Sequence, residues 1–490
     1  MKRKVNCLCI LAFSLLILSI SVIPSLSKPE GRLYSEERWV RFIHEYKKAE
    51  YAYDIIQSRD GCYIVLTYSG NLSSGQWDIH LVCLDRYGSL KWEKMLGGNK
   101  DDTPLHIEQT SDGGFIIAGY TKSYGVGGGD VWLIKTDENG NEIWNRTYGG
   151  RYEDGALYVE QTRDGGYIIS GCTMSYSWEH YVPIGWIIKT DENGNEIWNK
   201  TIGGRATFVQ PWRVHQTDDE GYLIVATLYH LVHPNPNEWV TTCSDIWLIK
   251  TDENGNETWN KTYNYSVYDI ALDATLTKDG GCVMVGVKWN LTGSENYPIM
   301  HVIKVDGKGN VEWREAFKGK ENPYHPETFG GTIQLTSDGG YIVSGSNTGP
   351  YTIVDNIFLT SPLERLWLIK LDENGKEEWN RSYQVMGCDL TGPFTIVKQT
   401  MDGGYIATGT LYGIRTSMYH PTGTLVVKTD SMGRTRELQL KLCMFMHLQW
   451  FVKQWIYLKW GYEIKSMPSQ SHVWHSLTPD RLAPPIHFYR

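Results

Sequence analysis

The sequence predicts an all-β fold made of repeated four-stranded antiparallel units. Two short elements lead to this prediction: Ser/Thr-x-Asp-x-Gly followed by a hydrophobic run, and Lys-Thr-Asp-Glu-Asn-Gly-Asn-Glu-x-Trp-Asn. The third observation is that both recur along most of the chain, about 50 to 65 residues apart, in seven copies by the count of their aspartates. A period of this size indicates a repeat architecture. Seven four-stranded antiparallel units predict a seven-bladed β-propeller.

Two neighbouring copies show where the four strands of a unit fall. Tyr158–Thr162 is predicted to form a first strand, and Tyr167–Gly171, rich in β-branched and aromatic residues, a second. Asp130–Lys135 illustrates the third strand and Glu142–Thr147 the fourth. The Asn-Gly pair at Asn139 predicts a tight hairpin between these last two, with positive φ at both central residues of the turn.

The two repeated elements are interpreted as turns. The segment Asp137–Glu142 invites a calcium interpretation, but it lacks the EF-hand spacing of carboxylates at loop positions 1, 3 and 5 with Gly at 6. We therefore expect a hairpin there and no metal. In the first element the aspartate is expected to accept hydrogen bonds from nearby backbone amides; these residues are Asp112, Asp164, Asp279, Asp338 and Asp402.

The two ends of the repeat region predict how the propeller closes. The last copy finishes its third strand at Thr424–Lys428 and then loses the pattern, whereas Glu37–Phe42 has the pattern of a fourth strand without a preceding third. We expect the strand of Trp39 to complete the last blade, which removes an open sheet edge. Residues 35–430 are therefore predicted to form one seven-bladed propeller of four-stranded antiparallel blades, closed by an N-terminal strand.

Residues 1–27 have the layout of a secretory signal peptide. Lys2, Arg3 and Lys4 precede an apolar run from Val5 to Ile23, which is the arrangement that directs export. A retained N-terminal membrane anchor is the alternative. The protein is accordingly expected to be secreted or extracellular, or anchored at a membrane.

Composition narrows the classes of partner. The formal net charge is −9, and removal of the basic leader makes it more negative, so nucleic acid is not expected as a partner. The cysteines after the leader fall at different repeat positions with no Cys-x-x-Cys spacing. A disulfide framework is not expected, although one isolated bridge stays open, and the spacing of metal ligands is absent. No cofactor is predicted.

Seven Asn-x-Ser/Thr sequons would make an exported protein a candidate glycoprotein. The alternative is that four of them are one repeated motif copied by duplication. They are Asn71, Asn145, Asn199, Asn260, Asn264, Asn290 and Asn380.

Residues 434–490 form an atypical tail without the repeat motif. Leu438–Trp460 is apolar and aromatic with interspersed Lys and His. One interpretation is a membrane-surface segment with peripheral membrane contact; the other is a translated frameshift.

The Asp-Gly-Gly-Tyr-Ile strand and the Leu-Ile-Lys-Thr-Asp-Glu-Asn-Gly-Asn-Glu-Ile-Trp segment resemble kelch-like and pyrroloquinoline-quinone-type repeats of exported propellers from archaea and bacteria. The resemblance covers about four fifths of the chain and implies a fold more than an activity. The first element also resembles the Asp-box of sialidase propellers, without its terminal aromatic. In such propellers the tryptophan packs between adjacent blades, which implies a structural role for Trp92, Trp144, Trp198, Trp259, Trp313 and Trp379.

Function is expected where the copies differ. With the first strand innermost, the loops between second and third strands and those between blades share one face, and variable loops on a rigid scaffold are where binding usually sits. We predict a binding module for a carbohydrate or protein ligand at the cell surface. The alternatives are a catalytic propeller, quinone-dependent or glycan-cleaving, or a structural envelope protein; no catalytic constellation is found. The predicted ligand-binding residues are Trp178, His180, Tyr181, Trp212, Tyr229, His230, His233, Trp239, Tyr324 and His325.

Overall fold

The computed structural model describes residues 38–43, 48–71, 76–177, 182–235, 238–289, 297–319, 328–348, 353–354, 357–358, 364–383, 388–390, 395–413 and 423–435. The chain divides into two units, Met1–Glu36 and Glu37–Arg490. All described residues belong to the second unit, and all of their regular secondary structure is β-strand. The predicted signal peptide, and the predicted tail beyond Thr435, lie outside the described residues.

The strands follow one another in groups of four, named A to D within each group. The first three groups are β2 (Lys48–Gln57), β3 (Tyr63–Asn71), β4 (Trp77–Leu84) and β5 (Leu90–Leu96); β6 (Asp102–Gln109), β7 (Phe115–Thr121), β8 (Asp130–Thr136) and β9 (Glu142–Tyr148); and β10 (Asp154–Gln161), β11 (Tyr167–Thr173), β12 (Ile184–Thr190) and β13 (Glu196–Ile202).

The next three groups are β14 (Thr207–Gln216), β15 (Tyr222–Asn235), β16 (Glu238–Thr251) and β17 (Glu257–Tyr263); β18 (Tyr268–Leu276), β19 (Cys282–Trp289), β20 (Ile299–Val305) and β21 (Val311–Phe317); and β22 (Thr328–Leu335), β23 (Tyr341–Thr348), β26 (Glu364–Leu371) and β27 (Glu377–Tyr383). The last group holds β28 (Cys388–Leu390), β29 (Ile396–Gln399), β30 (Tyr405–Gly413), β31 (Gly423–Thr429) and β1 (Trp39–Ile43). Outside the groups, β24 (Ile353–Val354) pairs with β25 (Ile357–Phe358).

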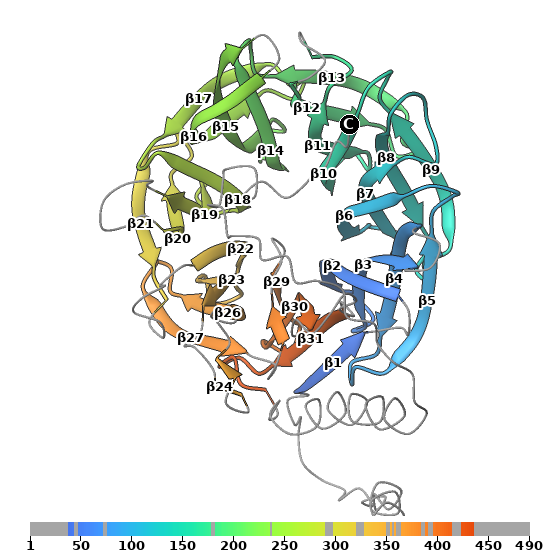
Figure 1. Cartoon of the computed structure of the whole chain (residues 1–490), viewed down its shortest axis with the longest axis vertical. Helices are drawn as coiled ribbons and strands as arrows, with labels where there is room; N and C mark the ends of the chain where they lie inside the picture. The colour runs from blue at the N-terminus through green and yellow to red at the C-terminus, as the bar shows by residue number, and fades with distance from the viewer. Residues whose placement is uncertain are drawn as a thin grey trace, which may run out of the picture. The chain divides into compact units, whose positions relative to one another are not determined.

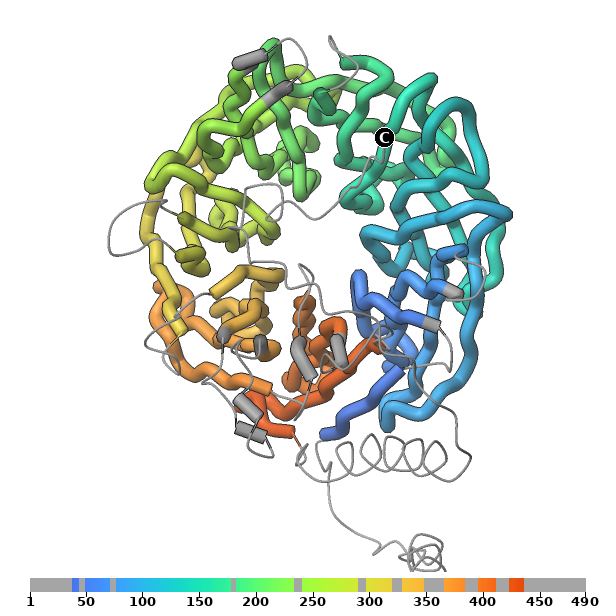
Figure 2. Tube along the Cα trace, viewed as in Figure 1, coloured from blue at the N-terminus to red at the C-terminus, as the bar shows by residue number. Residues whose placement is uncertain are grey.

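In the first six groups, neighbouring strands pair antiparallel in chain order. In the last group the short strands β28 and β29 both take the A position and pair with β30, β30 pairs with β31, and β31 pairs with β1. In Figures 1 and 2 the groups follow one another around a centre, with the A strands innermost and the D strands outermost, which is the arrangement of a β-propeller. A single parallel bridge between Ser244 and Tyr268 joins the sheets of β14–β17 and β18–β21. Among the described strands every sheet is open, so no sheet closes on itself as a barrel does.

The strand of Trp39 lies where the sequence predicts it. β1 pairs antiparallel with β31, with Trp39 opposite Lys428. The second group has the same pairing between its C and D strands, where Trp144 of β9 lies opposite Lys135 of β8. A strand from the start of the described chain therefore takes the D position beside the last C strand.

The repeated tryptophans pack between neighbouring sheets. A Cβ added at Gly140, in the C–D turn of the second group, would lie 2.7 Å from the Trp92 ring of the first group. Glycine is required there because any side chain would displace the indole. The same contact joins Trp144 to Gly194, Trp198 to Gly255, Trp259 to Gly309, Trp313 to Gly375, Trp379 to Gly433 and Trp39 to Gly88.

The C–D hairpins differ from the predicted two-residue turn. Gly140 has φ +74°, whereas Asn139 does not have positive φ. The Asp137 N–H donates to Asn141 O and the Gly140 N–H to Asp137 O, while the Asp137 carboxylate accepts from the Asn139 and Asn141 N–H groups. This is a three-residue loop with glycine in the left-handed region. The prediction of positive φ at both central residues was wrong, because the capping aspartate keeps Asn139 right-handed.

The predicted turn aspartates also pair with buried lysines. The Thr110 hydroxyl and the Gly114 N–H donate to Asp112 Oδ1, as the sequence indicates. In addition, Lys135 Nζ on β8 lies 2.9 Å from Asp112 Oδ2 and donates to Thr136 O. Burial opposes ionisation, but the hydrogen bonds from Lys135, Thr110 and Gly114 lower the pKa of Asp112 to about 2. The pairing recurs in Lys189–Asp164, Lys250–Asp219, Lys304–Asp279, Lys370–Asp338 and Lys428–Asp402.

Candidate binding site

A small cavity lies along the innermost strands. It has a volume of about 40 Å³ and is lined by residues of the A strands of every group. Five of these strands carry a β-bulge at the same place, and a bulge re-aims the extra side chain. The bulged residues that line the cavity are Tyr53, Leu105, Leu157, Trp212 and Leu272.

Beside these residues lies a set of buried charges. His106 Nε2 is 3.5 Å from Asp54 Oδ2, and that carboxylate also accepts from the Ile107 N–H. Arg213 Nε donates to Asp273 Oδ1, whose other oxygen accepts from the Ile333 N–H at 2.7 Å. The bonds of both aspartates cross from one sheet to another, so the charges tie neighbouring A strands together.

Burial dominates the titration of this set. It lowers the pKa of His106 far below the usual value, helped by the charges of Arg213 and Lys398. It raises the pKa of Asp54, and it raises that of Glu108 to about 7. Shifts of this kind are typical of functional sites but also occur in structural networks.

A second network lies further along the same strands. His215 Nδ1 is 2.7 Å from Glu160 Oε2, and its Nε2 is 3.0 Å from Ala274 O. Burial works against the imidazolium, but the Glu160 carboxylate outweighs it and the pKa of His215 is raised. The pair links three consecutive groups, since Glu160, His215 and Ala274 lie on β10, β14 and β18.

The size of the cavity limits what these groups can do. A volume of about 40 Å³ accommodates water rather than an organic substrate. The buried acid and base groups therefore serve best as cross-links between sheets.

The two ends of the strands differ. A–B and C–D turns share one end, here called the turn end, because neighbouring strands are antiparallel. B–C loops and D–A connections share the other, here called the loop end. Six exposed large hydrophobic residues lie at the loop end, with exposures of 36–68%: Tyr124, Val126, Tyr176, Val232, Val240 and Val267.

The β15–β16 hairpin projects from the loop end. Each of its strands has 14 residues, and they pair as far as Asn235 opposite Glu238. The inner neighbour β14 pairs with β15 only up to His230, and the outer neighbour β17 pairs with β16 only as far as Ile246. Just beyond these points the Leu231 N–H still donates to Ala206 O, and Ser244 bridges Tyr268 of β18. Among the described strands, none pairs with the hairpin further toward its tip.

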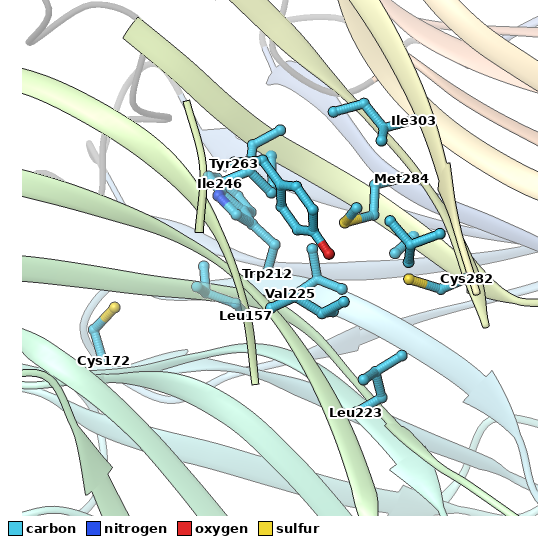
Figure 3. Close-up of a cluster of buried hydrophobic side chains, with 14 residues drawn as sticks. Leu157, Cys172, Trp212, Leu223, Val225, Ile246, Tyr263, Cys282, Met284 and Ile303 are labelled. Atoms are coloured by element: carbon cyan, nitrogen blue, oxygen red, sulfur yellow. The ribbon is translucent and has the colours of Figure 1, made fainter. Parts of the chain in front are cut away.

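Three predicted ligand-binding residues have described side chains. His230, on the projecting hairpin, is partly exposed and its Nε2 lies 2.8 Å from Asp245 Oδ2. Trp212 and Tyr229 were predicted in loops, but they lie in β14 and β15 and are 4% and 3% exposed. Hydrophobic burial determined both positions: Trp212 belongs to the core cluster in Figure 3, and Tyr229 stacks on Phe208 at 5.0 Å.

The other predicted ligand-binding residues lie outside what the structure describes. For His233 and Trp239 the strands are described but the side chains are not; Trp178, His180, Tyr181, Tyr324 and His325 are not described at all.

Sequence reasoning missed the buried charges of the A strands. The available signal was a charged or polar residue three positions before the Gln that recurs near the end of most first strands, as at Asp54 and His106. It went unused because a single charged residue in a strand is more often solvent-facing.

In the described part of the chain, no group of three or more His, Cys, Asp or Glu side chains is placed to hold a metal ion. Cysteines 62, 83, 172, 243 and 282 carry free thiols. Among the described residues no helix is long and apolar enough to cross a membrane.

No protein-family model matches the sequence, and no curated protein matches it. Among solved structures, it is similar to the β-propeller domain of the Trilobed protease from Pyrococcus furiosus, with 11% identity over 81% of this chain and 97% of that one and a TM-score of 0.44. The polysaccharide lyase Uly1 is 10% identical over 84% and 95% of the two chains, with a TM-score of 0.47. For a puromycin hydrolase the identity is 12%, the TM-score 0.48, and the chain spans 54% of its length. These likenesses are too low to assign an activity.

Proposed function

We propose that this protein is an exported, closed seven-bladed propeller that binds a carbohydrate or protein ligand at the cell surface through its loop end. The observation that carries the proposal is the β15–β16 hairpin, which extends past its neighbours and bears exposed Val232 and Val240. Apolar residues on a projecting element cost solubility unless a partner covers them.

Closure is supported by hydrogen bonds between the last group and the first. Gln57 Oε1 of β2 accepts from the Met401 N–H at 2.8 Å, as Gln109 accepts from the Arg59 N–H between the first two groups. The Trp39 ring meets Gly88 as the other tryptophans meet the next turn glycine. The seven groups would then form one ring without a free outer edge.

The catalytic alternative finds its best support in Glu108, whose pKa of about 7 suits a general acid or base. Against it stands the position of Glu108, which is not among the residues that line the cavity and whose carboxylate accepts from the Gln161 N–H of the next group. A structural envelope role would use the same exposed hairpin for self-association. Export, the kelch-like or quinone-type kinship, glycosylation of the sequons and membrane contact through the tail remain parts of the proposal that rest on sequence alone.

The experiment is a glycan-array measurement on the full chain, with and without calcium, repeated on a library of surface peptides. We expect specific binding that Trp239→Ala and Val240→Ser reduce at least tenfold. Ile197→Ala, an exposed residue on the outer strand β13, serves as the control and should leave binding unchanged. A folded protein that binds neither class, or loses binding equally in all three variants, would refute the proposal.

A further inference from the structure

A cavity with a volume of about 290 Å³ lies between the sheets of the third and fourth groups. An apolar cavity of about 150 Å³ is enough to hold benzene, so this one has room for a single aromatic ring with its substituents. Side chains of both sheets form its apolar wall: Ile187, Trp198, Ile202, Tyr222, Ile224 and Ile249.

The cavity lies where other groups place a tyrosine. Ile202 ends β13, four residues after Trp198. At the same position β9 ends with Tyr148, which is buried and whose hydroxyl donates to Gly194 O, in the C–D turn of the next group, at 2.6 Å. The fourth and sixth groups repeat this bond, from Tyr263 to Gly309 O and from Tyr383 to Gly433 O. A phenol ring with its hydroxyl on a turn carbonyl is therefore a recurring part of these junctions.

Isoleucine supplies neither the ring nor the hydroxyl. Ile202 is partly exposed, whereas Tyr148 is only 8% exposed. Gly255, in the C–D turn that lines the same cavity, is partly exposed as well. The corresponding turn glycines of the other groups are all buried: Gly88, Gly140, Gly194, Gly309, Gly375 and Gly433. The space that a tyrosine ring fills elsewhere is thus open here, and it leads to Gly255.

The other groups without a tyrosine at this position compensate in different ways. Phe317 of the fifth group is a buried ring without a hydroxyl. In the first group, Leu81 reaches the turn of the second, since its Cδ2 would lie 3.3 Å from a Cβ added at Gly140. In the last group, Arg41 Nε donates to Gly88 O at 2.6 Å. The junction of the third and fourth groups is lined for a ring that its own isoleucine does not provide.

The mouth of the cavity is crossed by a polar contact. Lys200 of β13 and Asn256 of the following turn both line the cavity and are both exposed. Lys200 Nζ donates to Asn256 Oδ1 at 3.2 Å, which joins the third group to the fourth. A small molecule fits beneath this contact, whereas a ring attached to a peptide backbone would have to displace it.

We propose that this cavity binds a small free phenol, whose ring takes the place of the tyrosine ring and whose hydroxyl donates to Gly255 O. Burial of the ring against Ile187, Ile224 and Ile249 supplies most of the affinity. The hydroxyl supplies selectivity, because it satisfies a carbonyl that Ile202 cannot reach with a donor. The proposal is independent of ligand binding at the loop end, since this cavity lies between two sheets.

The test is calorimetric titration of the full chain with p-cresol, which is the side chain of tyrosine as a free molecule. We expect saturable binding at one site with a Kd of about 1 mM or tighter, which a ligand of this size can reach. 4-Methylanisole has the same ring without a hydroxyl donor and should bind at least about fivefold more weakly. N-acetyltyrosinamide carries the phenol on a peptide backbone and should also bind more weakly than p-cresol, because its backbone meets the contact at the mouth.

Ile202→Tyr supplies the missing ring from the chain itself. This variant should lose p-cresol binding and, without ligand, should unfold a few degrees above the unchanged protein, since filling a cavity stabilises the folded state. Ile197→Tyr is the matched control, because it makes the same substitution on β13 at a residue that is 57% exposed. It should keep the binding and the unfolding temperature of the unchanged protein.

Three results with p-cresol would overturn the proposal: no saturable binding, binding that persists in Ile202→Tyr, or an equal loss in Ile197→Tyr. Equal affinity for 4-methylanisole would show that no hydroxyl donates to Gly255 O, and a phenol would then be the wrong ligand. Tighter binding of N-acetyltyrosinamide than of p-cresol would assign the cavity to a tyrosine side chain of a peptide and would refute a free phenol.

Discussion

The turn end and the loop end of the strands are built on opposite principles. At the turn end, the same lysine–aspartate pair and the same tryptophan–glycine contact recur from sheet to sheet. At the loop end the groups differ: one has a projecting hairpin, two have a glycine after the D strand that lies against an aspartate, and one has Asn264 there instead, which donates to Asp245. The repeated contacts at the turn end thus hold neighbouring sheets together, so the sequence and length of the segments at the loop end can differ from group to group.

The largest effect should come from a repeated contact at the turn end. Trp144→Ala leaves a cavity against Gly194 and the ring of Tyr167, 5.9 Å away. We expect a loss of about 3–5 kcal/mol in the free energy of unfolding, measured by urea denaturation. The neighbouring Ile143→Ala, 59% exposed, should change it by less than about 0.5 kcal/mol. Equal losses in both variants would contradict the packing role.

A smaller effect is expected from a repeated ion pair. Lys428 is fully buried, donates to Thr429 O and lies 2.8 Å from Asp402 Oδ2. Lys428→Met should cost about 1–3 kcal/mol, because it leaves the carbonyl unpaired while Asp402 can still reach water. Urea denaturation of this variant and of Lys308→Met, on an exposed turn, provides the comparison. A loss equal to that of the control would show that the pair adds nothing.

The pH dependence of stability should separate the two ends. Hydrogen bonds lower the pKa of Asp112 to about 2, so its contribution is present above about pH 4 and is lost as the pH falls toward 2. At the loop end, burial raises the pKa of Asp78 to about 6 and of Asp130 to about 7. These folded-state values exceed the unfolded value of 3.8, so the contribution of Asp78 and Asp130 to stability should fall as the pH rises from about 4 to 7.

Thermal unfolding between pH 2 and 8 measures both changes: the loss of stability below about pH 4, called the acid limb, and the fall between about pH 4 and 7, called the neutral limb. Asp130→Asn should flatten the neutral limb and leave the acid limb in place, whereas Asp112→Asn should weaken only the acid limb. A neutral limb that persists in Asp78→Asn/Asp130→Asn would assign it to another buried acid, such as Glu108.

The smallest effect on stability is expected at the hairpin. Val232→Ser and Val240→Ser replace residues that are 46% and 40% exposed, so the free energy of unfolding should change by less than about 0.5 kcal/mol. Urea denaturation measures this beside the binding assay. A loss above 1 kcal/mol would mean that the hairpin packs against the rest of the protein and is not a free binding element.

Sequence reasoning performed well where a residue's partner lies within its own repeat, as for the strands of one unit and the turn role of Asp112. It also placed the Trp39 strand beside Lys428 at the other end of the chain, because the repeat pattern showed which strand each end lacks. It failed for Trp212 and Tyr229, because aromatic composition does not tell a loop that meets solvent from a strand that continues into a core. It also failed for the C–D turn, where a two-residue loop was predicted. The Asp137 carboxylate accepts from the Asn139 and Asn141 N–H groups and so stabilises a three-residue loop instead.

By itself the sequence determined the repeat, the strands and the glycine and tryptophan positions, because these depend on residues near in the chain. Only the tertiary structure decided which groups meet between sheets. Asp54 and Ile107, or Asp130 and Asp154, face one another because separate strands converge at one edge. Burial between the strands removes water from the carboxylates of Asp54 and Asp130 and raises their pKa values. A local sequence pattern does not contain this information, because the burial depends on how closely two separate sheets approach each other.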